Sequence, residues 1–234
     1  SKEFMDEYTY YTNNKDSILE VLNNEQNICN TKNYLKYQID SAINILKQKK
    51  FLDENNQLTP IAKLSLEINE CNEIILSKLI FNNFLDNLNY KEIGVVLSIF
   101  TDTKSNCESE IQSEILLKSI DPFKNIIEFV ENISIEMEKL EGIYKVYLNS
   151  NWYINTDIMS AINDWLNDIN FSDIVLKYEI YEGNFIKDCL KIYNLASSLV
   201  KISILQNKPA LEHESRMLME KIVKDIISVE SLYV

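Results

Sequence analysis

The sequence has few of the residues that interrupt helices or build common catalytic sites. Its 234 residues include only three glycines, three prolines and one histidine. Because glycine occurs only at positions 94, 142 and 183, neither G-x-x-x-x-G-K-[ST] nor G-x-G-x-x-G can be written, so no standard glycine loop cradles phosphates. Asn-Gly and Asp-Gly hairpin turns are also absent. We therefore predict a nearly all-α protein that does not hydrolyse ATP unaided.

The sequence also has few of the histidine and cysteine patterns that form metal and redox sites. His213 is the only histidine, which excludes an H-E-x-x-H zinc site, and its charged neighbours in "LEHESR" are typical of a solvated helix start. The four cysteines form no C-x-x-C pair. Paired carboxylates such as Asp164 and Asp168 are best explained as solvent-facing charge. We predict no catalytic residue, no metal and no cofactor in this chain, and a reduced intracellular protein whose compartment, nucleus or cytoplasm, stays open.

The balance of charge and the length of apolar runs restrict the partners. The formal net charge is -13, whereas affinity for phosphates depends on clustered positive charge. Any contact with nucleic acid must therefore be local, and such a chain could form one wall of a larger channel. No apolar run approaches the ~20 residues that span a bilayer, so we predict no membrane partner.

Apolar spacing predicts a multi-helix bundle with a long C-terminal helix pair. Residues 1–33 are weakly periodic and unassigned, and a helical pattern begins at Tyr34. The polar "DENNQ" predicts a turn, followed by a helix with Thr59 as N-cap and Pro60 at its first position. We assign 34–70 to a small helix-turn-helix or winged-helix-like segment and 71–234 to the bundle. Later helices are expected at about 111–149 with a break at Pro122, 158–166, 171–176, 182–206 and 211–232.

The expected helix at 182–206 has two contrasting faces. At 100° per residue its apolar residues share one side, and its cations and small polar residues share the other. The polar set is Lys187, Lys191, Asn194, Ser198 and Lys201, opposite Phe185, Cys189, Ile192, Ala196 and Leu199. The pattern alone favours a solvated helix face over a binding surface.

Two blocks of sequence identify a family resemblance. The stretches "DWLNDINFSDIVLKYEIYEGNFIKDCLKIYNLASSL" and "MEKIVKDIISVESLYV" resemble the C-terminal helical (DSHCT) domain of exosome-associated DExH-box RNA helicases, and "LTPIAKLSLEIN" is similar to its L-T-x-x-G segment. The resemblance covers about 34–234. Residues that match its structural motif are Trp165, Phe171, Glu182, Gly183, Asp225, Leu232 and Tyr233. Ala62, Asn83 and Asp168 stand where the family has glycine, and Lys187 and Lys224 stand where arginine is usual.

The resemblance implies an accessory C-terminal helical domain of an ATP-dependent RNA helicase. It makes 182–206 the ratchet helix, with Lys187, Lys191, Asn194 and Ser198 facing single-stranded RNA. ATP and magnesium would then belong to motor domains outside this chain, and those domains and exosome-type RNA-decay proteins would be partners. A freestanding helical protein-interaction scaffold that has lost the motor is the alternative. A third candidate, the winged-helix and ratchet region of DEAH-type helicases, is disfavoured by the "KDIISVESLY" ending.

Overall fold

A computed structural model describes residues 2–105, 116, 121–148 and 152–224 of the chain. Over these ranges the structure is helical and holds no strand, apart from one isolated bridge between Leu52 and Leu58. The predicted all-α multi-helix bundle is confirmed. The elements are α1 (Lys2–Gln48), α2 (Pro60–Ser65), α3 (Glu73–Phe81), α4 (Tyr90–Leu97), the 3-10 helix η1 (Ser98–Phe100), α6 (Asp121–Tyr144), α7 (Met159–Leu166), α8 (Phe171–Tyr178), α9 (Glu182–Leu205) and α10 (Pro209–Ile222).

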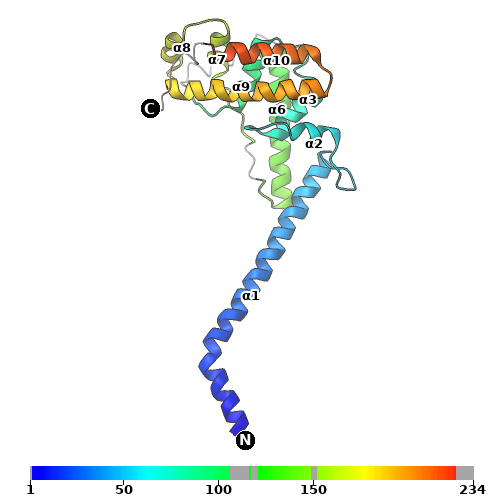
Figure 1. Ribbon diagram of the computed structural model, residues 1–234, viewed down its shortest axis with the longest axis vertical. Helices are drawn as coiled ribbons and strands as arrows, with labels where there is room; N and C mark the ends of the chain where they lie inside the picture. The colour runs from blue at the N-terminus through cyan, green and yellow to red at the C-terminus, as the bar shows by residue number, and fades with distance from the viewer. Residues whose placement is uncertain (1, 106–115, 117–120, 149–151, 225–234) are drawn as a thin grey trace.

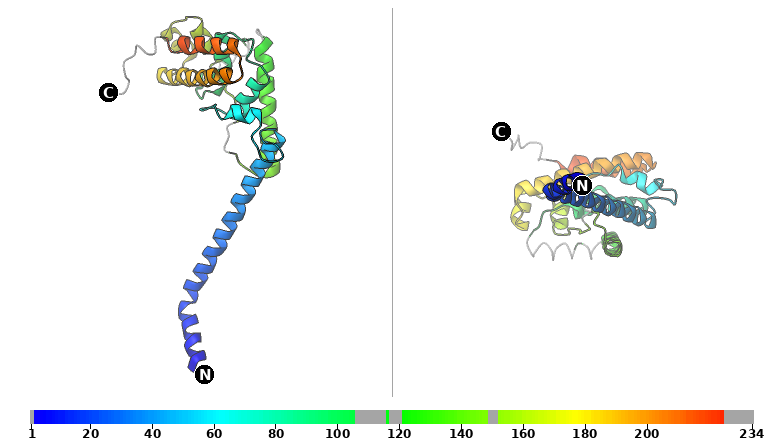
Figure 2. Two further views of the ribbon diagram at one scale, coloured as in Figure 1. Left: turned by 45° about the vertical axis from the view of Figure 1, so that its right-hand side comes forward. Right: turned by 90° about the horizontal axis from the view of Figure 1, so that it is seen from below.

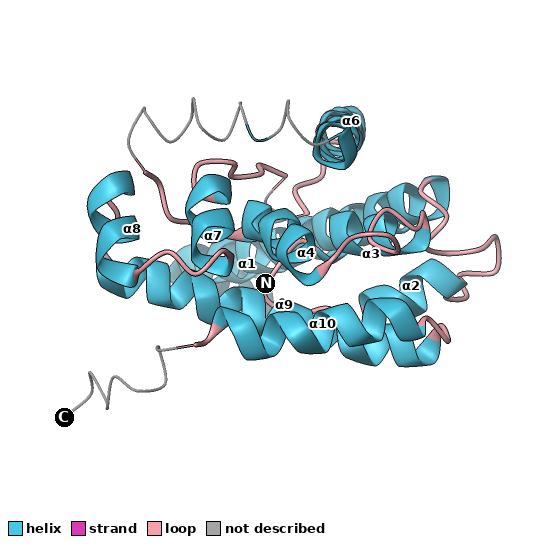
Figure 3. Cartoon of the chain, turned by 90° about the horizontal axis from the view of Figure 1, so that it is seen from above, coloured by secondary structure: helices cyan, strands magenta, loops and turns pink. Residues whose placement is uncertain are grey.

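The helices of the bundle lie in layers. Seen from above, α8, α7, α4 and α3 form a middle row, with α6 on one side of it and the pair α9 and α10 on the other (Figure 3). The last two helices run side by side in opposite directions, joined by a tight turn in which Asn207 has a φ of 54° (Figure 1). This is the predicted C-terminal helix pair. The second helix was expected to continue to 232, but α10 ends at Ile222 and residues 223–224 form a turn, while residues 225–232 lie outside the described part of the chain.

Close approach between layers depends on Gly94 in the middle of α4. A Cβ atom added at Gly94 would lie 2.5 Å from Cδ1 of Leu166 on α7 and 2.9 Å from Cδ1 of Leu218 on α10. Because any side chain would push these leucines away, glycine allows α4 to sit between the two helices. The sequence pattern gave no sign of this packing role.

Helix α1 differs from the expectation for the N-terminal part of the chain. It runs unbroken from Lys2 to Gln48, across the predicted start of helix at Tyr34, and projects away from the bundle (Figures 1 and 2). Its described residues before Ser41 are exposed or half-buried, and Ser41 is its first buried one. A helix that packs against so little has no need of an apolar stripe, which explains why its periodicity was too weak to predict. The domain division proposed for residues 1–33, 34–70 and 71–234 stays a prediction.

The predicted helix, turn and second helix are present at the base of α1. The turn starts at Lys49, Lys50 within it has a φ of 62°, and the next residue, Phe51, is buried in the core. Thr59 precedes α2 as expected, but its side chain makes no capping hydrogen bond. Instead its Oγ1 donates to the carbonyl oxygen of Lys50 at 2.7 Å, so it fastens the two ends of the turn together.

Two of the three residues that replace family glycines have left-handed backbone conformations. The φ angles are 61° at Asn83 and 67° at Asp168, a region that glycine enters without steric cost. Asparagine and aspartate are the other residues that tolerate this conformation best. Ala62, in contrast, is buried within α2 and needs no such freedom. The turn geometry thus explains a glycine at two of these positions in the family pattern.

Candidate nucleic-acid interface

An aromatic cluster holds the first turns of α9 against the bundle. The ring of Phe185 lies 6.0 Å from that of Trp165 on α7 and 5.9 Å from that of Phe171 on α8, and the last two are 6.1 Å apart. Phe185 and Trp165 are fully buried. The two contacts of Trp165 are edge-on, and each contact of this kind adds about 0.5–1.5 kcal/mol to the effect of burial. The cluster fixes which side of α9 can face outward.

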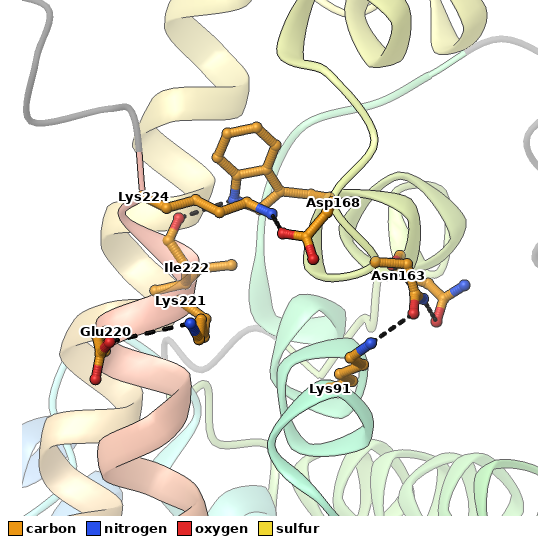
Figure 4. A network of polar contacts seen from close by, with 9 residues as sticks. Lys91, Asn163, Asp168, Glu220, Lys221, Ile222 and Lys224 are labelled. Atoms are coloured by element: carbon orange, nitrogen blue, oxygen red, sulfur yellow. Dashed lines mark hydrogen bonds and ion pairs between the residues drawn. The ribbon is translucent and has the colours of Figure 1, made fainter.

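Trp165 also links α7 to the end of α10. Its Nε1 donates a hydrogen bond of 2.9 Å to the carbonyl oxygen of Ile222. The amine of Lys224 lies 4.8 Å from the centre of the Trp165 ring and forms an ion pair with Asp168 (Figure 4). This interaction holds the pKa of the exposed Asp168 carboxyl below its usual value. Lys224, which replaces a family arginine, therefore has a structural partner within the chain.

The polar face of α9 is only partly exposed. Lys187, Asn194 and Lys201 are exposed and Lys191 is half-buried, so these residues line an accessible edge. Ser198 is 5% exposed, which contradicts its predicted place on that edge. The physical reason is that the middle of α9 is enclosed, because every residue from 195 to 200 except Ser197 is buried.

Acidic residues from distant parts of the chain face the accessible edge of α9. The amine of Lys191 lies 3.1 Å from Oδ2 of Asp102, just after η1. The side-chain amide of Asn194 donates to both carboxylate oxygens of Glu70, at 2.9 and 3.1 Å. Neither acid could be predicted from the sequence, because residues 89 and 124 positions away give no periodic signal.

A cleft of 780 Å³ opens beside this edge of α9. Its charged lining comprises Glu70, Glu73 and Asp102 against Lys104 and Lys191, so acids outnumber cations. Phe100 and Tyr153 add aromatic surface, and Tyr153 is 66% exposed. We call this space the α9 cleft. Since Phe100 is buried, the cleft offers the ring of Tyr153 for a base to stack on, but the charge of the lining opposes phosphate.

A buried carboxylate lies close to the α9 cleft. Asp188 on α9 is 5% exposed, and its Oδ2 has no hydrogen-bond partner within the described structure. Burial is the main cause that raises its pKa to about 6, helped by the charge of Asp102 and opposed by a hydrogen bond from Thr103. Sequence analysis missed Asp188 too, although a carboxylate next to the apolar side of a helix was a usable signal.

Metal and membrane sites find no support in the described residues. Those residues hold no group of three or more histidine, cysteine, aspartate or glutamate side chains arranged to bind a metal ion. Burial raises the pKa of the Cys71 thiol to about 12 and also raises that of Cys189, so neither thiol is activated. Among the helices described, none combines the length and apolar character that crossing a bilayer requires.

Comparison with known proteins identifies the family. The model of the DSHCT (NUC185) domain matches residues 55–230, about three quarters of the sequence. The chain belongs to the DSHCT family. Relatives include an uncharacterized helicase of Schizosaccharomyces pombe, 26% identical over 198 residues, and the human exosome RNA helicase MTR4, 21% identical over 189. Each alignment covers 81% of this chain but 18% of the relative. The antiviral helicase SKI2 of Saccharomyces cerevisiae is 23% identical over 199 residues, 83% of this chain and 15% of its own length.

Residues of the DSHCT sequence motif have different structural roles here. Trp165 and Phe171 belong to the core cluster that positions α9. Glu182 is exposed in the first turn of α9, where a carboxylate interacts favourably with the helix dipole. Gly183 has no positive φ, and a Cβ added there would meet no atom within 4 Å. Asp225, Leu232 and Tyr233 lie outside the described residues.

Proposed function

We propose that this chain is the accessory helical domain of an ATP-dependent RNA helicase, where it guides single-stranded RNA and braces the motor domains. The observation that carries the proposal is the DSHCT match over residues 55–230, because the relatives include the human exosome RNA helicase MTR4 and the antiviral helicase SKI2. ATP and magnesium would bind to the motor domains, since this sequence contains no phosphate-binding glycine loop. An intracellular location and contact with RNA-decay proteins belong to the same proposal.

The accessible edge of α9 would be the RNA-guiding surface. Its exposed residues Lys187 and Asn194 are separated by a helical rise of ~10 Å, which a short stretch of single strand can follow, and Lys201 lies beyond the enclosed residues 195–200. Lys191 stands between Lys187 and Asn194 beside the α9 cleft. A phosphate there would compete with Asp102 for the amine of Lys191, so we expect the isolated chain to bind RNA weakly and with strong dependence on salt.

The test is charge reversal on α9 in the intact helicase. Lys187→Glu combined with Lys191→Glu should reduce RNA-stimulated unwinding roughly tenfold, because two phosphate contacts are replaced by repulsion. Basal ATPase activity and the fold should change little. Lys187→Glu alone should show part of the loss without disturbing the ion pair of Lys191. Lys139→Glu, an exposed lysine on α6, is the matched control and should unwind normally.

Two outcomes contradict the guiding role. One is normal unwinding by the double variant together with unchanged crosslinking of α9 to RNA. The other is an equal loss in the Lys139→Glu control, which would show a general effect of charge.

A protein-interaction scaffold is the second candidate, and the acidic lining of the α9 cleft favours it. Three carboxylates oppose two lysines there, in a chain of net charge -13. Such a surface suits a basic segment of a protein better than a phosphate backbone. Capture of a lysine-rich peptide by the α9 cleft that weakens as salt is added, without RNA binding, would support the scaffold.

A further inference from the structure

A second cleft, of 510 Å³, lies on another part of the molecule. It is bounded by the turn that follows α1, the start of α2, the end of α3 and the middle of α6. Figure 2 shows α6 running beside the end of α1, where this projecting helix joins the bundle. We call this space the α6 cleft. None of the residues predicted to bind RNA lines it.

The charge of the α6 cleft is opposite to that of the whole chain. Lys49, Lys50 and Lys78 line it, against the single carboxylate of Glu136. The side chain of Lys49 is 5% exposed and forms an ion pair with Glu136, which is 57% exposed. Because the whole chain has a net charge of -13, this local excess of cations distinguishes the α6 cleft from the average of the sequence.

The lysines of the α6 cleft have too few carboxylate partners to balance their charge. The pKa of Lys78 is lowered mainly by burial and next by the charge of Lys49, and only Glu136 acts in the opposite direction. The pKa of Glu136 is lowered in turn, mainly by its hydrogen bond with Lys49. One partly exposed carboxylate thus serves two buried or half-buried amines. An incoming anion would stabilise both charged amines.

Beside the charged residues and the polar Thr59, Asn82 and Asn132, the lining of the cleft includes several apolar side chains. Ile61 on α2 and Ile133 on α6 are buried in its floor, and Phe81 at the end of α3 is 47% exposed. Phe129 on α6 is held in place by the ring of Phe84, whose centre is 4.5 Å away. This arrangement fits a large apolar side chain in a preformed hollow.

We propose that the α6 cleft binds a protein segment in which an apolar or aromatic side chain is flanked by carboxylates. The apolar side chain would lie against Phe81 and Phe129, and a carboxylate would pair with Lys78 and Lys50. A compact hollow with an apolar floor suits one anchoring side chain, whereas a nucleic-acid strand needs a continuous basic track. The inference does not depend on the proposed RNA role of α9.

Fluorescence anisotropy of the 234-residue chain with a labelled short peptide tests the proposal. The peptide carries a phenylalanine between aspartate and glutamate in a glycine-serine background. Lys78→Met keeps the apolar stem but removes the amine, and should weaken binding about tenfold, the effect of one charge-assisted hydrogen bond. Phe81→Ser, at an exposed position, should also weaken binding. Lys139→Met on α6 is the matched control and should bind as the unaltered chain does. Circular dichroism checks that each variant is folded.

Control peptides test whether binding needs both the carboxylates and the aromatic side chain. A peptide with asparagine and glutamine in place of the acids, or with serine in place of phenylalanine, should bind at least several-fold more weakly. Equal binding of the amide peptide, an equal loss in Lys139→Met, or no binding of the acidic peptide would overturn the proposal. Binding of a uridine oligonucleotide that Lys78→Met abolishes, without binding of the peptide, would also overturn it in favour of nucleic acid.

Discussion

The α9 cleft and the α6 cleft show how differently lysines can be used in one acidic chain. Lys191 and Asn194 beside the first are engaged by Asp102 and Glu70, and acids outnumber cations in its lining. Lys49 and Lys78 beside the second share Glu136. The comparison teaches that a row of lysines on a helix does not make a basic surface. The carboxylates that other segments bring to it decide its charge.

The largest effect is expected for a substitution of Trp165, and it tests whether the two clefts belong to one folding unit. Trp165→Ala should lower the free energy of unfolding by about 3–5 kcal/mol, because it removes a fully buried indole and its hydrogen bond to Ile222. Urea unfolding followed by circular dichroism measures the change. Trp165→Phe, which keeps an aromatic ring, should cost less. Since α3 contributes to both clefts, they should unfold in one transition, and a second transition would show that they are independent.

A smaller effect concerns the charge buried beside the α9 cleft. The pKa of Asp188 is raised to about 6 in the folded chain, above the ~3.9 of an unfolded aspartate. The folded state therefore holds this proton more tightly. The stability it contributes is complete below about pH 4 and is lost as the pH rises through about 6.

Asp188→Asn should remove that dependence. The difference in unfolding free energy between the variant and the unaltered chain should grow by roughly 2 kcal/mol in the variant's favour from pH 4 to pH 7. Urea titrations at several pH values measure it, and subtraction cancels the other carboxylates. A difference that does not vary with pH would show that Asp188 titrates normally.

The smallest effect is expected when acids beside α9 are neutralised. This change tests most directly whether those acids decide the charge of the α9 cleft. Asp102→Asn combined with Glu70→Gln should strengthen binding of a uridine oligonucleotide by the isolated chain up to about fivefold at low salt, because each exposed contact contributes about 0–1 kcal/mol. The gain should fall as salt is added. Glu138→Gln on α6 is a matched control with an exposed acid. Unchanged affinity in the double variant would mean that these acids do not limit access to α9.

Much of the fold could be predicted from local patterns. The limits of α9 and α7 fall within a residue of those expected, because their apolar stripes reflect one buried face. Helix α1 was only partly predicted, since its first forty residues contact little of the bundle. The role of Gly94 was missed for the opposite reason. It depends on leucines from two other helices, which no local pattern reveals.

By itself the sequence determined the all-α class, the family and the polar edge of α9, because helix periodicity and motif spacing act over a few neighbouring residues. Only the tertiary structure decided that Ser198 is enclosed, that Asp102 and Glu70 face the lysine edge, and that Lys49, Lys78 and Glu136 meet in one cleft. The reason is physical. Burial and electrostatic interactions depend on distance in space, and the fold brings together the charges of Lys191 and Asp102, which lie 89 residues apart in the chain.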